Sequence, residues 1–158
     1  MDEATEMGTV ISPEHLLKVE SYIDLAEEEG GIILAGGTRE MTGYNGPEGI
    51  GAFLRPTVVD NLPYTSRCAT EEIFGPMVTL HSFTSEQEAL RMVNSSEYGL
   101  AGSVWTSDLE RGERFSSQID SGIVWVNTWL HRDLRTPFGG VKNSGVGREG
   151  GQLSLIHI

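Results

Sequence analysis

Two adjacent carboxylates stand in residues 71–76, whose sequence is EEIFGP. A carboxylate such as that of Glu72 can bind a ribose diol through its two acceptor oxygens, and an aromatic ring such as that of Phe74 can pack beside a flat heterocycle. The Gly-Pro pair at 75–76 is equally typical of a plain turn between a strand and a loop. The chemistry of these residue types alone favours the turn.

A second cluster, Arg132-Asp133-Leu134-Arg135, is basic within an otherwise acidic chain. It follows a short apolar stretch that ends at Asn127. Two arginines close to the C-terminal end of a strand could bind a carboxylate. The alternative is a surface ion pair between Arg132 and Asp133, and the sequence chemistry does not decide between the two.

Three further features are weaker candidates for a functional site. Residues 145–150, GVGREG, match a dinucleotide-binding pattern, but that pattern must follow a strand and open a helix. The preceding residues 138–144 do not read as a strand, so we expect irregular backbone with positive φ. Cys68 has no histidine near it in the sequence to act as a base, and a structural thiol is the better interpretation. The histidines show no metal-ligand spacing, and these are His15, His81, His131 and His157.

Helical and extended segments alternate along the chain. Helices are predicted over residues 13–29, with Ser12 as the cap, over 85–93, with Ser85 as the cap, and over 108–119. In the last of them we expect Leu109, Phe115 and Ile119 to face inward. Short strands are predicted over 32–35, 53–59, 77–83, 101–105 and 122–127, and a loop over 38–51.

This alternation favours an α/β fold with a largely parallel sheet and flanking helices. The strands are few for a sheet that is covered on both faces, which indicates an incomplete domain. We therefore expect apolar faces such as residues 123–126 to be left uncovered.

Composition excludes several classes of protein. The chain has 158 residues, the usual size of one domain, and a net charge of −12. This charge argues against binding to nucleic acid or to anionic lipid. No apolar run is long enough to cross a membrane, and the acidic N-terminus does not resemble a signal peptide. With a single cysteine, a cytoplasmic protein is expected.

Several motifs, taken in order, resemble the aldehyde dehydrogenase superfamily. They are EEIFGP at 71–76, the preceding GxFxxPTV at 51–58, YGLA at 98–101, SGxVWVN at 121–127 and PFGGVKNSG at 137–145. The resemblance covers residues 1–152 and implies a partial catalytic domain, the last third of a family member. Residues 129–136, WLHRDLRT, resemble the 2-aminomuconic and 2-hydroxymuconic semialdehyde dehydrogenases.

The resemblance implies roles for five residues. Glu72 would bind the nicotinamide-side ribose of NAD, Phe74 would pack by the nicotinamide, and Leu100 would lie near the cofactor. Phe138 would line the substrate funnel, and Arg132 would face a substrate carboxylate. NADP remains an alternative to NAD.

The segment that the chain resembles lacks the catalytic groups of full-length family members. The family's nucleophilic Cys, general-base Glu, oxyanion Asn and dinucleotide-binding sheet lie upstream of the segment that this chain resembles, and Cys68 is in the wrong place for the nucleophile. We therefore expect a fragment of an NAD-dependent aldehyde dehydrogenase that is inactive by itself, from a parent that acts on a small aldehyde as a homo-oligomer. The alternative is a non-catalytic binding or regulatory module derived from the same fold.

The last six residues, LSLIHI at 153–158, break from the family pattern. They can be encoded by a transposase end sequence that is used in preparing sequencing libraries. We expect them to be a non-native tail.

Overall fold

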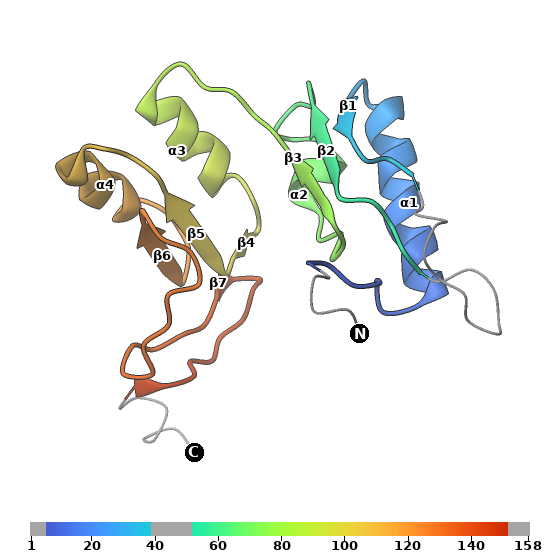
Figure 1. Ribbon diagram of the computed structural model, residues 1–158. Helices are drawn as coiled ribbons and strands as arrows, with labels where there is room; N and C mark the ends of the chain where they lie inside the picture. The colour runs from blue at the N-terminus through green and yellow to red at the C-terminus, as the bar shows by residue number, and fades with distance from the viewer. Residues whose placement is uncertain (1–5, 39–51, 152–158) are drawn as a thin grey trace. The chain divides into compact units, whose positions relative to one another are not determined.

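The computed structural model describes residues 6–38 and 52–151, and Figure 1 shows its helices and strands. The chain divides into two compact units, with the boundary between Ser82 and Phe83. The predicted α/β class is confirmed, because helices and short strands alternate in both units. Most of the loop predicted over 38–51 and the tail predicted at 153–158 lie outside the described residues.

Helix α1, Pro13–Glu28, is the longest element of the first unit. The Ser12 side chain caps it by accepting a hydrogen bond from the backbone N–H of His15 at 3.1 Å. The helix ends before Gly30, whose φ of 88° suits a residue without a side chain. Both ends lie where the sequence predicts them.

The apolar face of α1 forms the core of this unit. The buried residues of this cluster, Leu16, Val19, Ile23, Leu54 and Ile73, pack together. Ile73 belongs to the EEIFGP segment, so burial of one side chain fixes that segment against the helix.

Three strands form the sheet of the first unit in the order β1-β2-β3. They are β1 (Ile32–Ala35), β2 (Thr57–Asp60) and β3 (Met77–Thr79), with the short helix α2 (Arg67–Thr70) between β2 and β3. β1 and β2 are antiparallel, whereas β2 and β3 are parallel.

Strands β2 and β3 are shorter than predicted. Pro56 has no N–H to donate, so regular pairing in β2 begins at Thr57, whose N–H donates to the carbonyl of Pro76 at 2.8 Å. After Thr79, one further bond joins Leu80 to Val59, and no regular strand continues to residue 83.

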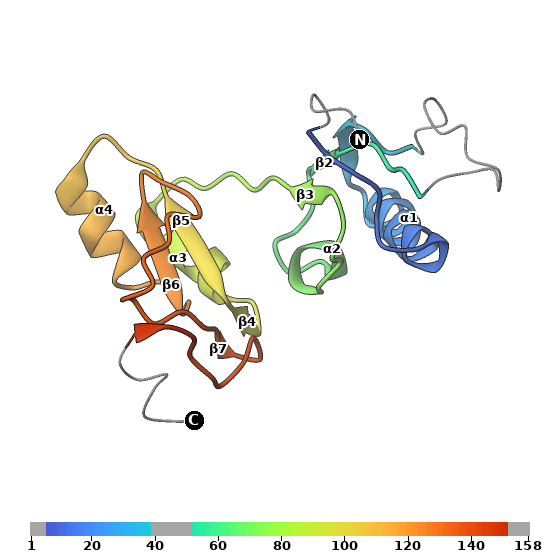
Figure 2. The ribbon, with the colours of Figure 1, turned by 60° about the horizontal axis from the view of Figure 1, so that its bottom comes forward.

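The second unit is built around a β–α–β arrangement, seen from a second direction in Figure 2. β5 (Ala101–Val104) and β6 (Ile123–Val126) are parallel partners connected through α4 (Leu109–Ser116). Helix α3 (Glu86–Asn94) precedes them, and β4 (Tyr98–Gly99) pairs with β7 (Val141–Lys142).

Three expectations for the second unit are wrong. Leu109 is 65% exposed, because it is the first residue after the capping Asp108 and lies on the solvent side of α4, while Phe115 and Ile119 are half-buried. Residues 123–126 are half-buried rather than uncovered, and Trp125 among them is only 8% exposed. β7 forms where no strand was predicted, because two residues give no periodic pattern to read.

Exposed apolar side chains lie instead on the strands of the first unit. Ile32, Leu34 and Val78 are each more than half exposed. No helix among the described residues is both long and apolar enough to cross a membrane.

Candidate functional site

The two neighbouring carboxylates of the EEIFGP segment have different surroundings. The Glu71 carboxylate accepts hydrogen bonds from Arg67 Nε at 2.8 Å and from the Tyr22 hydroxyl at 2.6 Å. These donors, Arg67 first, lower the pKa of Glu71 to about 2. The Glu72 side chain is exposed, and within the part of the chain that the structure describes its carboxylate has no hydrogen-bond partner. Glu72 is therefore the one with free acceptor oxygens.

The backbone of Phe74 is fixed by a hydrogen bond to His15, whereas its ring is exposed to solvent. The side chain is 78% exposed, and its φ of 57° is unusual for a residue with a side chain. The carbonyl oxygen of Phe74 lies 2.7 Å from Nε2 of His15, which must carry the proton because a carbonyl only accepts. With Ile73 buried between them, Glu72 and Phe74 are presented together on the surface of the first unit.

Leu100, the third residue expected near a cofactor, belongs to the second unit. It lies between β4 and β5, is 48% exposed, and its carbonyl accepts a hydrogen bond from Ile123 N–H at 3.3 Å. The start of β6 thus fixes the backbone of Leu100.

Arg132 and Phe138, the two residues expected at the substrate, are brought together. The Arg132 guanidinium carbon lies 4.5 Å from the centroid of the Phe138 ring. Both residues line one pocket of about 230 Å³ beside β6. Its other lining residues are Ile123, Val124, Trp125, His131, Asp133 and Thr136.

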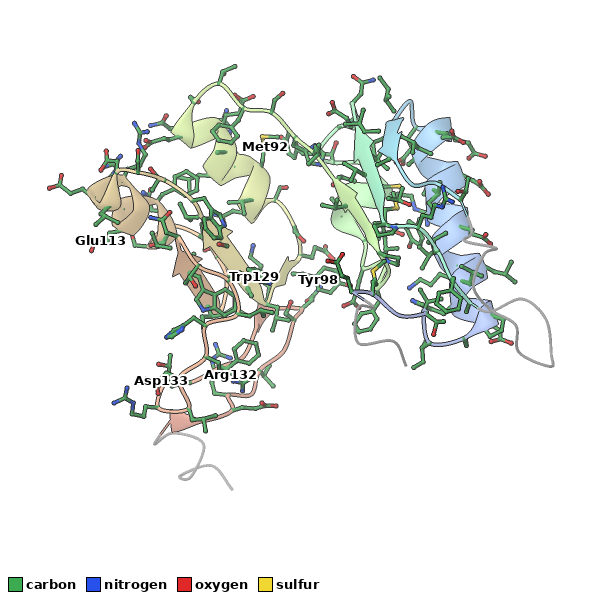
Figure 3. All side chains as sticks on the ribbon, viewed as in Figure 1. Met92, Tyr98, Glu113, Trp129, Arg132 and Asp133 are labelled. Atoms are coloured by element: carbon green, nitrogen blue, oxygen red, sulfur yellow. The ribbon has the colours of Figure 1, made fainter. Side chains whose placement is uncertain are left out.

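The expected alternative for Arg132, an ion pair with Asp133, is wrong. Asp133 instead accepts from the side chain and the backbone N–H of Arg135, two residues further on. Arg132 contacts Glu149 through Nη2 and Oε2 at 3.2 Å. Figure 3 labels Arg132 and Asp133 on the loop that follows β6. The local turn captures Asp133, which leaves Arg132 to face the pocket.

Two tryptophans and a glutamate that the sequence did not single out support this pocket. Trp125 Nε1 donates to the carbonyl of His131 at 2.8 Å, and its ring meets that of Trp129 edge-on at 5.2 Å. Glu149 and Phe138 exchange two backbone hydrogen bonds of 2.7 Å. The WVNTW spacing could have indicated the aromatic pair, but nothing local links residues 138 and 149.

Cys68 has the surroundings of a structural thiol. It is 5% exposed, and its Sγ lies 3.4 Å from the carbonyl oxygen of Tyr22. Burial, followed by the charge of Glu29, raises the pKa of the Cys68 thiol to about 11. Such a thiol forms little nucleophilic thiolate at neutral pH, which supports the interpretation of Cys68 as a structural residue.

The glycine pattern at 145–150 and the possible metal ligands can also be examined in the structure. Gly145 and Gly150 have φ values of 138° and 70°, so the glycines at the two ends of GVGREG serve the positive-φ backbone that we expected. Across residues 6–38 and 52–151, no group of three or more His, Cys, Asp or Glu side chains could hold a metal ion.

Comparison with known proteins places the whole chain in one family. The sequence profile of the aldehyde dehydrogenase family matches residues 1–158. The chain is 48% identical over 151 residues to the 2-aminomuconic 6-semialdehyde dehydrogenase of a Pseudomonas species. This alignment covers 96% of the present chain and 30% of that protein. It is 44% identical over 153 residues to the 2-aminomuconic semialdehyde dehydrogenase of Mus musculus, covering 97% and 31% of the two chains.

The fold agrees with the sequence match. A crystal structure of betaine aldehyde dehydrogenase from Staphylococcus aureus in complex with NAD+ is similar with a TM-score of 0.91 at 42% identity. The match covers 99% of this chain and 30% of that one. The chain thus spans about 30% of the length of the relatives that it matches, and within that span it belongs to the aldehyde dehydrogenase family.

Proposed function

We propose that this chain is part of the catalytic domain of an NAD-dependent aldehyde dehydrogenase whose substrate is an aldehyde with a remote carboxylate, such as a muconic semialdehyde. The observation that carries the substrate class is the pocket beside β6, where the Arg132 guanidinium lies over the Phe138 ring. A planar guanidinium can bind a carboxylate with two parallel hydrogen bonds, and the aromatic wall suits a conjugated carbon chain.

The relatives support the same substrate class. The names of the Pseudomonas and mouse proteins describe the oxidation of 2-aminomuconic semialdehydes. We carry this substrate class over to the present chain because Arg132 stands in a pocket with apolar walls. Its carboxylate partner is the exposed Glu149 and not Asp133, and a substrate carboxylate could replace that contact.

Glu72 and Phe74 fit a role in holding the nicotinamide end of the cofactor. Glu72 offers two free acceptor oxygens that suit a ribose diol, and the exposed ring of Phe74 offers a flat apolar surface. When bound, NAD supplies the acceptor for the hydride that leaves the substrate. From the family resemblance alone, we also propose that Leu100 of the second unit contacts the cofactor, and this proposal does not choose between NAD and NADP.

We place the nucleophile and the general base in the part of the enzyme that precedes this chain. The only cysteine here is buried and has a raised pKa, which makes it unsuited to attack an aldehyde. We therefore propose that the chain does not oxidise aldehydes without the rest of the enzyme.

A hybrid enzyme tests the carboxylate site. In this hybrid, residues 1–152 of the chain replace the matching segment of the Pseudomonas relative. Because Arg132 is 47% exposed, we expect Arg132→Ala to raise KM for carboxylated aldehydes about tenfold, the lower end for a hydrogen bond to a charged group. KM for simple aliphatic aldehydes should stay nearly unchanged.

Arg91→Ala is the control, because it removes the same charge from an exposed position on α3 that does not line the pocket. It should leave both KM values close to those of the unmodified hybrid. Equal effects of Arg132→Ala on both classes of aldehyde would remove the carboxylate role.

A further inference from the structure

Three polar side chains on one face of α1 contact the segment that contains Glu72 and Phe74. They are His15, Lys18 and Tyr22, spaced three and four residues apart, so they lie one above the other along the helix. Each contacts a different residue of 71–74, which gives the helix three separate points of attachment.

The contacts run in opposite order along the two segments. Tyr22 donates to the Glu71 carboxylate at 2.6 Å, Lys18 Nζ donates to the Glu72 carbonyl at 3.2 Å, and His15 Nε2 donates to the Phe74 carbonyl at 2.7 Å. The EEIFGP segment therefore lies antiparallel along α1, and its backbone carbonyls point toward the helix at the two positions that flank Ile73.

The apolar side chains next to this stripe hold the segment close. Ile73 packs into the cluster formed by Leu16, Val19 and Ile23 of the same helix. Gly75 approaches so closely that a Cβ atom there would lie 2.5 Å from Cγ2 of Val19. The segment thus has an apolar attachment in the middle and polar attachments on its two sides.

We propose that His15, Lys18 and Tyr22 are positioning residues that fix which carboxylate is offered to the cofactor and in which direction. This inference rests on the proposed function, in which Glu72 binds the cofactor ribose. Tyr22, together with Arg67, holds Glu71 in place, so Glu72 alone keeps both acceptor oxygens free. Lys18 and His15 hold the backbone on either side of Ile73, including the left-handed conformation of Phe74.

The test uses the hybrid enzyme and measures KM for NAD separately from KM for the aldehyde. Lys18→Met and His15→Leu should each raise KM for NAD about 3- to 10-fold, the effect of one lost hydrogen bond that orders a binding group. KM for the aldehyde and the thermal midpoint should change little. Lys18→Arg and His15→Gln, which keep a donor, should restore most of the loss.

Asp24→Asn is the control, because Asp24 is an exposed charge on α1 that lies two residues beyond the stripe. It should not change KM for NAD. A general weakening of the helix would instead lower the thermal midpoint in every variant and would raise both KM values together, and that result would overturn the proposal.

A double-mutant cycle between Lys18→Met and Glu72→Gln separates the inference from the proposed function. If Lys18 acts through Glu72, the effect of Lys18→Met should be largely lost in the Glu72→Gln background. An undiminished effect there would show that Lys18 acts independently and would overturn the inference alone. If Glu72→Gln by itself left KM for NAD unchanged, the proposed cofactor role would fail and the inference with it.

Discussion

Adjacent residues of the same type can differ in role because their partners come from elsewhere in the chain. Glu71 is bound by Arg67 and Tyr22, whereas Glu72 directs its carboxylate into solvent. The Tyr22–Glu71 contact joins residues 49 positions apart. The residue types alone favour a turn at EEIFGP, and only the family resemblance singles out Glu72. The partners that hold Glu71 and leave Glu72 free could not be predicted.

The thiol of Cys68 provides a prediction at the same scale. Burial raises its pKa from the usual 9.0 to about 11, so near pH 8 the folded chain should contain about 100-fold less thiolate than the unfolded chain. Iodoacetamide labelling of the 158-residue chain, followed by mass spectrometry, should be slow in buffer and fast in denaturant. The modification is unambiguous because Cys68 is the only cysteine.

The same raised pKa fixes the sign of a pH effect. The contribution of the neutral, buried thiol to stability is complete below pH 9 and is lost as the pH rises toward 11. Labelling rates at pH 8 that are equal with and without denaturant would contradict the buried position of Cys68.

Arg132 shows what residue types alone leave open. The sequence allowed either a pairing with Asp133 or an arginine that faces a pocket. Asp133 is captured by Arg135 through a tight local turn, and this choice depends on backbone geometry that composition does not contain. Glu149, which contacts Arg132 from 17 residues away, was not predicted for the same reason.

At the scale of elements, the sequence predicts what local rules control. Ser12 and Ser85 each accept a hydrogen bond from the third residue of their helix, as predicted. Asp108 does the same for α4, although the sequence prediction placed it inside that helix. The lengths of β2 and β3 and the existence of β7 were not predicted, because strand ends depend on partners that are distant in sequence.

The contact between β6 and the loop at 139–140 gives a prediction for an element. A Cβ atom at Gly122 would fall far inside the contact distance of the Gly139 carbonyl oxygen. Gly122→Ala should therefore force the loop away from the start of β6 and destabilise the hybrid enzyme by about 1–3 kcal/mol. Thermal unfolding measured by scanning fluorimetry would report the loss.

Gly147→Ala is the control for this substitution. An added Cβ at Gly147 would meet nothing within 4 Å, and its φ is not positive, so the change should stay within about 0.5 kcal/mol. Similar unfolding midpoints for the two variants would mean that Gly122 does not need to be small.

For the whole molecule, we propose that the chain supplies cofactor and substrate contacts to a larger enzyme. Its family match runs over all 158 residues, yet it spans about 30% of its relatives. Apolar side chains on β1 and β3, such as Ile32, Leu34 and Val78, remain exposed. We interpret these strands as surfaces that the rest of the enzyme covers.

The most direct test is NADH formation from 2-aminomuconic 6-semialdehyde, the compound in the name of the Pseudomonas relative, by three samples: the hybrid enzyme, that unmodified relative and the 158-residue chain alone. We expect NADH formation by the hybrid and by the relative, and none by the isolated chain. NADH formation by the isolated chain would show that the nucleophile lies within these residues and would overturn the proposed function. A folded but inactive hybrid beside an active relative would equally overturn the proposal that residues 1–152 supply these contacts.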